Sequence, residues 1–149
     1  MSKLIIAGKI SSDLDHIKFV KAKNVYFKGF YTYSQAPKIY QEGDIYLSTQ
    51  FNDTCPSAVL ESMACGLPVV YLNCGGTPEL VEDAGIGLIV ENSWDRYNYP
   101  TAENYAYAMM RAIENRKELS QLARNRTITM FDTQKWKTRH EEIFSSVCE

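Results

Sequence analysis

The sequence predicts a single α/β domain in which a mostly parallel sheet carries helices on both faces, with a helical C-terminal third. In the first two-thirds of the 149 residues, short β-rich runs alternate with helical stretches, as in chains of βαβ units. In the final third, apolar residues recur three and four positions apart, which is the spacing of amphipathic helices. Hydrophobic residues make up 45% of the chain and charged residues 23%, so one ordinary core can form.

The individual elements of the first two-thirds follow from local composition. Five short apolar or β-branched runs are the predicted strands: Leu4–Ala7, Val25–Phe27, Ile45–Leu47, Val69–Leu72 and Gly87–Val90. Glycines flank three of these runs, at Gly8, Gly29 and Gly43. Four helices are predicted between the runs: Asp13–Val20, Gln35–Gln41, Ser57–Cys65 and Pro78–Glu82.

Apolar stripes at helical spacing organise the last third of the chain. The stripes are Tyr105, Met109 and Ile113; Leu119, Leu122 and Ala123; and Trp136, His140 and Ile143. Stripes of Met and aromatic residues are typical of core-facing helix surfaces. We therefore expect all three to be core and not a cofactor site.

Bulk properties exclude several classes of function. The formal net charge is −2 with both signs spread along the chain, so neither nucleic acid nor a membrane surface is the expected partner. No apolar run is long enough to span a bilayer and no cleavable signal peptide is recognisable, which predicts a cytoplasmic protein. The four cysteines match no zinc spacing and are expected to be reduced. Asp13-Leu14-Asp15 follows two serines and is interpreted as a helix start, so we predict no metal site.

The most informative segment follows the run Ile45–Leu47. Open parallel sheets bind ligands beyond the carboxyl ends of their strands, which is where the segment Ser48–Cys55 begins. In the helix that follows, Pro56 suits the first turn and Gly66 suits a left-handed end, while Thr54 is the expected cap. The helix is apolar almost all round, which predicts burial on most sides.

Three polar residues interrupt this apolar element. Glu61 lies mid-helix, Ser57 lies four residues earlier on the same face, and Asp53 precedes the helix. Amides at a helix start favour a phosphate, and a carboxylate one turn deeper can accept two hydrogen bonds from a vicinal diol. Phosphate and diol together indicate a nucleotide sugar. The alternative is that Asp53 is an ordinary loop residue and that Glu61 pairs with a Lys or Arg.

A second candidate feature is the glycine pair Gly75-Gly76, which follows the predicted strand Val69–Leu72. Paired glycines at a strand-to-helix turn let the backbone approach a ligand closely. Thr77 and Pro78 then begin the next helix. The alternative is a tight connection with no role in binding.

The run from Asp53 to Glu79 resembles the motif of group 1 (family 4) retaining glycosyltransferases. That motif has two acidic residues separated by seven others, then Ala-Met-Ala-Cys-Gly-x-Pro-Val-Val and Gly-Gly-x-x-Glu. This chain has Glu61-Ser62-Met63-Ala64-Cys65-Gly66-Leu67-Pro68-Val69-Val70 and then Gly75-Gly76-Thr77-Pro78-Glu79. Similarity elsewhere is weaker. The resemblance implies the GT-B fold of two facing Rossmann-like domains, with residues 1–149 as the C-terminal, donor-binding one.

The resemblance also implies roles for individual residues. Asp53 and Glu61 become the catalytic acidic pair, Asp53 contacting the transferred sugar and Glu61 the ribose hydroxyls of a UDP-, GDP- or ADP-sugar. The remaining implied donor-binding residues are Thr54 and Cys55 at the sugar, Ser57 at the diphosphate, Phe30 and Tyr31 at the base, and Gly75 and Gly76. The family requires no metal or other cofactor.

Three departures from the family pattern bear on activity. The first acidic residue is Asp53 where the family has Glu, and Pro56 cannot donate an amide hydrogen bond. The chain starts at the family's second strand, so the first strand and the N-terminal acceptor domain have no counterpart. We therefore expect the chain alone to be inactive, with a possible dimer through the exposed sheet edge. The alternatives are a donor-binding subunit of a split two-chain transferase and a non-catalytic interaction domain.

Overall fold

The computed structural model of the chain describes residues 2–9, 22–90, 92–93 and 96–147. The predicted helix at Asp13–Val20, with its Asp13-Leu14-Asp15 triplet, lies outside the described residues. The chain divides into two compact units, Met1–Gly43 and Asp44–Glu149, and each is described by itself.

The first unit is built on two parallel strands. β1 (Leu4–Ala7) pairs with β2 (Val25–Gly29), in a register that places Leu4 beside Val25 and shifts after Ile6. The chain then forms a short 3-10 helix (η3, Tyr33–Gln35) and α1 (Ala36–Tyr40). The Thr32 amide donates a 2.9 Å hydrogen bond to Gln35 Oε1, which stabilises the start of this helical segment. Both strands predicted here are confirmed.

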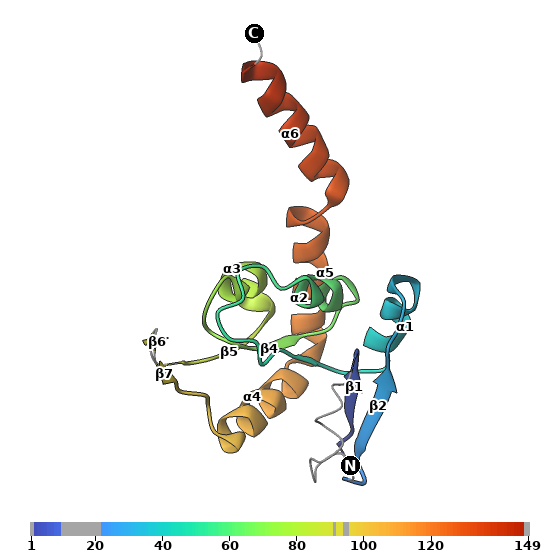
Figure 1. Cartoon of the computed structure of the whole chain (residues 1–149), viewed down its shortest axis with the longest axis vertical. Coiled ribbons are helices and arrows are strands. Elements are labelled where there is room, and N and C mark those ends of the chain that lie inside the picture. Colours follow the sequence, from blue (N-terminus) through green and yellow to red (C-terminus); the bar gives the residue numbers. More distant parts are fainter. Residues whose placement is uncertain (1, 10–21, 91, 94–95, 148–149) are drawn as a thin grey trace. The chain divides into compact units, whose positions relative to one another are not determined.

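The second unit contains a three-stranded parallel sheet in the order β3-β4-β5 (Figure 1). The strands are β3 (Tyr46–Leu47), β4 (Val69–Leu72) and β5 (Gly85–Leu88). α2 (Ser57–Ala64) connects β3 to β4, and α3 (Thr77–Val81) with the 3-10 turn η4 (Glu82–Ala84) connects β4 to β5. A short antiparallel pair, β6 (Asn92–Ser93) and β7 (Arg96–Tyr97), follows. The predicted mostly parallel α/β arrangement is confirmed.

The central strand β4 is buried on both faces because helices cover both sides of this sheet. Val70 and Leu72 pack in a cluster with Ala108 and Ala112 of α4 (Ala102–Glu114). Val69 and Tyr71 point to the opposite face, in a cluster with residues of α2, α3, η4 and α5 (Arg116–Met130). Figure 1 shows α2 and α3 on one side of β4 and β5 and α4 on the other. The alternating contacts follow from the two-residue period of a strand.

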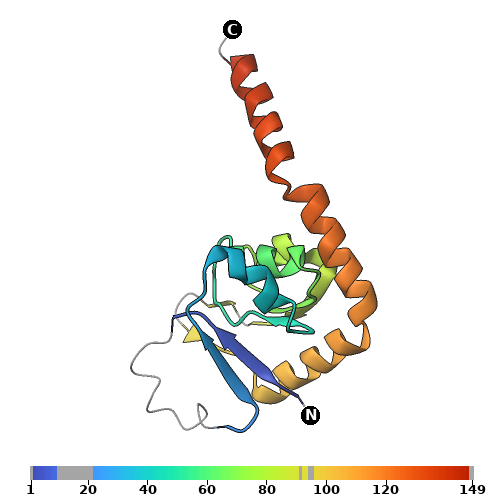
Figure 2. The same cartoon turned by 90° about the vertical axis from the view of Figure 1, so that its right-hand side faces the viewer.

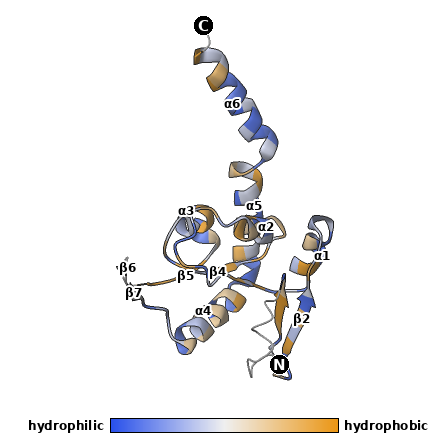
Figure 3. Ribbon diagram, viewed as in Figure 1, coloured by the Kyte–Doolittle hydropathy of each residue, from blue (hydrophilic) through white to orange (hydrophobic). Residues whose placement is uncertain are grey.

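The last helix departs from its predicted role. α6 (Thr133–Val147) continues beyond the end of α5 (Figure 2) and has no buried residue. Trp136 is 61% exposed and Phe144 is 64% exposed, and hydrophobic and hydrophilic segments alternate along α6 in Figure 3. The prediction that Trp136, His140 and Ile143 form a core stripe is therefore wrong, because the rest of the described chain buries no residue of α6. No helix among the described residues is long and apolar enough to cross a membrane.

Candidate functional site

The loop between β3 and α2 is anchored at both ends. At its start, the Ser48 amide donates to the carbonyl oxygen of Val70 at 2.8 Å, and the Ser48 side chain is buried. Phe51 packs against the core cluster on the α4 side, and its ring meets that of Tyr99 edge-on at 5.9 Å. Pro56 is buried at the far end. Asp53 lies between these anchors, so both ends of the loop that carries it are held in place.

Asp53 uses both its side chain and its backbone to shape this loop. Its Oδ1 accepts a 3.0 Å hydrogen bond from the Cys55 amide, while its carbonyl oxygen accepts one of 2.8 Å from the Gly76 amide. The first of these is an Asx-type turn, in which a carboxylate replaces a backbone acceptor. The Asp53 side chain is half-buried, and the Thr54 and Cys55 side chains are exposed. The Cys55 amide predicted to face a sugar is therefore engaged by Asp53 in this structure.

Pro56, and not Thr54, occupies the N-cap position of α2. No side chain caps the helix, so the prediction that Thr54 caps it is wrong. The physical reason is spacing, because Thr54 lies two residues before the N-cap position, from which a side chain serves the first turn. Ser57 is the first helical residue and is exposed. The start of α2 is thus an uncapped end next to an exposed hydroxyl, which is a favourable place for an anion.

Glu61 lies on the outer face of α2, the face that also carries Ser57. Val59, Ser62 and Met63 are buried, whereas Glu61 is partly exposed and has interactions within the chain. The helix ends as predicted, with Gly66 in the left-handed conformation at φ +77°.

Cys65, which follows the last residue of α2, has a thiol whose pKa depends on two nearby charges. Burial raises the pKa of the Cys65 thiol, the Arg124 guanidinium lowers it, and Glu61 raises it. Arg124 also donates from Nη1 to the carbonyl oxygen of Ala64. The Glu61 carboxylate and the Arg124 guanidinium therefore both act electrostatically on the Cys65 thiol.

The glycine pair lies against the Asp53 loop. A Cβ atom on Gly75 or Gly76 would fall well inside 3.0 Å of backbone atoms of Asn52, Asp53 or Thr54, a separation that real Cβ atoms essentially never show. The Asn52 amide also donates to Cys74 Sγ at 3.4 Å. The close backbone approach predicted for these glycines is therefore an approach to the chain's own loop.

These contacts bring most of the predicted site residues together in the second unit. Asp53, Thr54, Cys55, Ser57 and Glu61 lie on one loop and helix, and Gly75 and Gly76 lie on the adjacent turn. Both segments follow parallel neighbouring strands, so both emerge at the same edge of the sheet. Phe30 and Tyr31 follow β2 in the first unit, where Phe30 is 82% exposed and Tyr31 is partly exposed.

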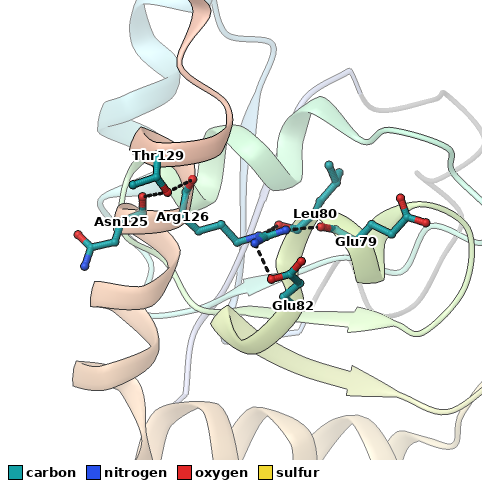
Figure 4. A network of polar contacts seen from close by, with 6 residues as sticks. All are labelled: Glu79, Leu80, Glu82, Asn125, Arg126 and Thr129. Atoms are coloured by element: carbon teal, nitrogen blue, oxygen red, sulfur yellow. Dashed lines mark hydrogen bonds and ion pairs between the residues drawn. The ribbon is translucent and has the colours of Figure 1, made fainter. Parts of the chain in front are cut away.

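Arg126 is a structural residue that sequence reasoning missed (Figure 4). Its guanidinium donates to the carbonyl oxygens of Leu80 (2.6 Å) and Glu79, and lies 2.6 Å from Glu82 Oε2. It therefore holds the end of α3, whose first turn adjoins Gly76. The available signal was its spacing, because Arg126 falls on the helical stripe of Leu119 and Ala123.

Other features of the described surface lie away from this site. Among the described residues, no group of three or more His, Cys, Asp or Glu side chains is placed to hold a metal ion. Two surface hollows are lined by residues 114–121 and by residues 132–142. Neither includes a candidate site residue.

Comparison with protein families gives a match over most of the chain. The sequence model of the family described as "Glycosyl transferases group 1" matches residues 1–115. The matched region includes the Asp53 loop, α2 and the glycine pair.

Two curated proteins of Bacillus subtilis (strain 168) are similar to this chain. Spore coat protein SA is 26% identical over 130 residues, which cover 87% of this chain and 30% of that protein. YtcC, whose name describes a glycosyltransferase, is 29% identical over 112 residues, covering 74% of this chain and 24% of that protein. The chain thus spans less than a third of either relative.

Solved structures show the same fold. A sucrose-phosphate synthase from Thermosynechococcus elongatus superimposes with a TM-score of 0.77 at 17% identity, covering 97% of this chain and 38% of that one. Anabaena HepE in complex with UDP-glucose superimposes with a TM-score of 0.73 at 22% identity, covering 97% and 41% respectively. The fold is therefore the Rossmann-like fold of GT-B glycosyltransferases.

Proposed function

This chain belongs to the group 1 glycosyl transferases, and from that premise we propose that it binds the nucleotide-sugar donor for retaining hexosyl transfer. The observation that carries the proposal is the position of Glu61. It is a partly exposed carboxylate in a helix that buries Val59, Ser62 and Met63, one turn behind an uncapped helix start. This combination of carboxylate and free helix end suits a ribose and a diphosphate.

Each part of the donor has a proposed contact. Glu61 accepts hydrogen bonds from the ribose hydroxyls, and Ser57 with the start of α2 receives the diphosphate. Asp53, Thr54 and Cys55 face the transferred sugar. Because Asp53 Oδ1 already accepts from the Cys55 amide, a sugar hydroxyl must share or replace that bond. Phe30 and Tyr31 border the base, and no metal takes part.

In this proposal residues 1–149 form the C-terminal donor domain, and an N-terminal acceptor domain supplies the other side of the cleft. Glycosyl transfer needs donor and acceptor positioned together with water excluded. The chain alone therefore binds nucleotide weakly and transfers no sugar. HepE was solved with UDP-glucose, which makes a uridine nucleotide the first ligand to test.

Calorimetric titration with UDP, GDP and ADP tests the binding proposal. We expect one nucleotide to bind, and Glu61→Gln to weaken its binding by about tenfold or more, because a charge-assisted hydrogen bond is lost. Glu114→Gln is the matched control, an exposed carboxylate on α4 away from the site. Equal affinity of Glu61→Gln and the parent chain would contradict the proposed ribose contact. Sugar transfer by the parent chain alone would contradict the half-cleft argument.

The exposed apolar residues of α6 favour a second candidate, a donor-binding subunit that works with a separate acceptor-domain chain. Trp136, Ile143 and Phe144 are 61%, 49% and 64% exposed, and no residue of α6 is buried. Co-expression with candidate acceptor-domain chains, followed by an assay of sugar transfer, distinguishes this candidate from a non-catalytic interaction domain. Transfer that requires both chains supports the split enzyme.

A further inference from the structure

The turn at residues 73–77, which contains the glycine pair, supports the Asp53 loop through direct contacts. The Asn73 amide donates to the carbonyl oxygen of Leu88 at 2.8 Å, and Cys74 and Thr77 are buried. The turn is thus hydrogen-bonded to strand β5 and packed into the core. The Asp53 loop contacts this turn through backbone atoms.

Gly76 is required by space and not by backbone conformation. Its φ of −89° and ψ of −5° are available to any residue, unlike those of Gly75, which has φ +63°. A Cβ atom at Gly76 would nevertheless collide with the carbonyl group of Thr54. The missing side chain at position 76 therefore leaves room for the Asp53 loop.

Two hydrogen bonds hold the Asp53 loop against the turn. The Gly76 amide donates to the Asp53 carbonyl oxygen at 2.8 Å, and the Asn52 amide donates to Cys74 Sγ at 3.4 Å. Asn52 has φ +52°, a left-handed conformation that turns the chain into Asp53. Because Asp53 is held through its backbone, the direction of its carboxylate depends on the turn below it.

We propose that Gly76 is a positioning residue that sets the Asp53 carboxylate for the sugar moiety of the donor, without itself contacting the donor. This inference rests on the proposed donor binding. It assigns the two parts of the donor to different residues, because Gly76 acts through the loop that faces the sugar, whereas Glu61 lies one helical turn into α2. A change at Gly76 should therefore reduce the affinity contributed by the sugar and leave the affinity for the nucleotide unchanged.

The test compares the affinities of nucleoside diphosphate and of the corresponding nucleotide sugar. Gly76→Ala should keep nucleoside diphosphate affinity within about twofold and remove about fivefold or more of the additional affinity given by the sugar. In the Asp53→Asn background, Gly76→Ala should cause little further loss, because both changes act through the same carboxylate. Gly87→Ala is the control: its Cβ would meet the Tyr71 ring at 3.1 Å, in β5 and away from the loop.

A second readout needs no ligand. In amide NMR spectra and hydrogen exchange, Gly76→Ala should change the signals of residues 52–55 and leave those of α4 unchanged. If Gly76→Ala does not fold, Cys74→Ala removes the acceptor of the Asn52 amide without adding volume, and should weaken the sugar contribution in the same way.

The outcomes separate this inference from the proposed function. If the parent chain binds neither ligand, the proposed function fails and the role toward the sugar fails with it, and the signals of residues 52–55 then decide only whether Gly76 holds the Asp53 loop. Unchanged loop signals in Gly76→Ala overturn it, as does a retained sugar contribution. An equal loss of nucleoside diphosphate and nucleotide-sugar affinity also overturns it.

Discussion

Arg126 on α5 donates a 2.6 Å hydrogen bond from Nε to the carbonyl oxygen of Leu80, near the end of α3. A helix end leaves carbonyl groups without partners in the helix, and here one guanidinium satisfies two of them and also pairs with Glu82. Arg126 is only 15% exposed, so water does not readily replace these bonds. The connection between β4 and β5 therefore depends on a residue far away in sequence.

Replacing Arg126 with Met should lower the free energy of unfolding by about 1.5–3 kcal/mol, because hydrogen bonds from a charged donor are lost and partly buried carbonyls remain. Chemical denaturation measures the change. Arg111→Met is the matched control, since Arg111 is exposed and its guanidinium donates a long hydrogen bond of 3.4 Å to Tyr107 Oη. Equal stability of the two variants would contradict a structural role for Arg126.

The apolar residues of α5 and α6 should differ sharply in their contribution to stability. Leu119→Ala on α5 removes a buried side chain and should cost about 2–5 kcal/mol. Ile143→Ala on α6 changes a side chain that is about half exposed and should shift stability by less than about 0.5 kcal/mol. Thermal unfolding of both variants measures the difference. A large loss in Ile143→Ala would mean that α6 is packed in solution.

The strands could be predicted because apolar runs and glycines mark them directly. β1 and β4 have the predicted bounds, whereas β5 begins two residues before the predicted Gly87. Gly85 belongs to that strand because it pairs with Val69 of β4, and a Cβ at Gly85 would collide with the carbonyl oxygen of Val69. A glycine needed for close strand packing cannot be told from a turn glycine without the neighbouring strand. The prediction that α6 is buried was wrong for a related reason, because helical spacing reveals an apolar face but does not show which part of the chain covers it.

The candidate site was predictable in its membership but not in its contacts. Asp53, Ser57 and Glu61 could be assigned to one loop and helix because their separation along the chain is short. The contact between the Asp53 loop and Gly76 could not be predicted, because this contact joins segments more than twenty residues apart through backbone atoms. Sequence patterns carry side-chain information, and this contact depends on the absence of a side chain.

A pH titration should detect the ion pair of Lys28 and Glu42 in the first unit. The 2.9 Å hydrogen bond from Lys28 Nζ lowers the pKa of Glu42 from its ordinary value of 4.5. A lowered folded-state pKa stabilises the folded state above the unfolded pKa, and this contribution is lost as pH falls through the folded pKa. Lys28→Met should move the Glu42 pKa upward, as measured by NMR of the carboxyl carbon. Lys38→Met, on α1, is the control.

The reactivity of the described cysteines should follow their exposure and the charges near them. Cys55 is exposed, Cys65 is half-buried and Cys74 is buried, so iodoacetamide should modify them in that order. Burial raises the pKa of Cys65, which leaves less thiolate at any given pH below it. Glu61 raises this pKa further, so Glu61→Gln should lower it and speed the reaction, whereas Arg124→Met should slow it. Mass spectrometry of the modified peptides measures both rates. An unchanged Cys65 rate in Glu61→Gln, with Glu114→Gln as control, would show that the Glu61 carboxylate does not act on the Cys65 thiol.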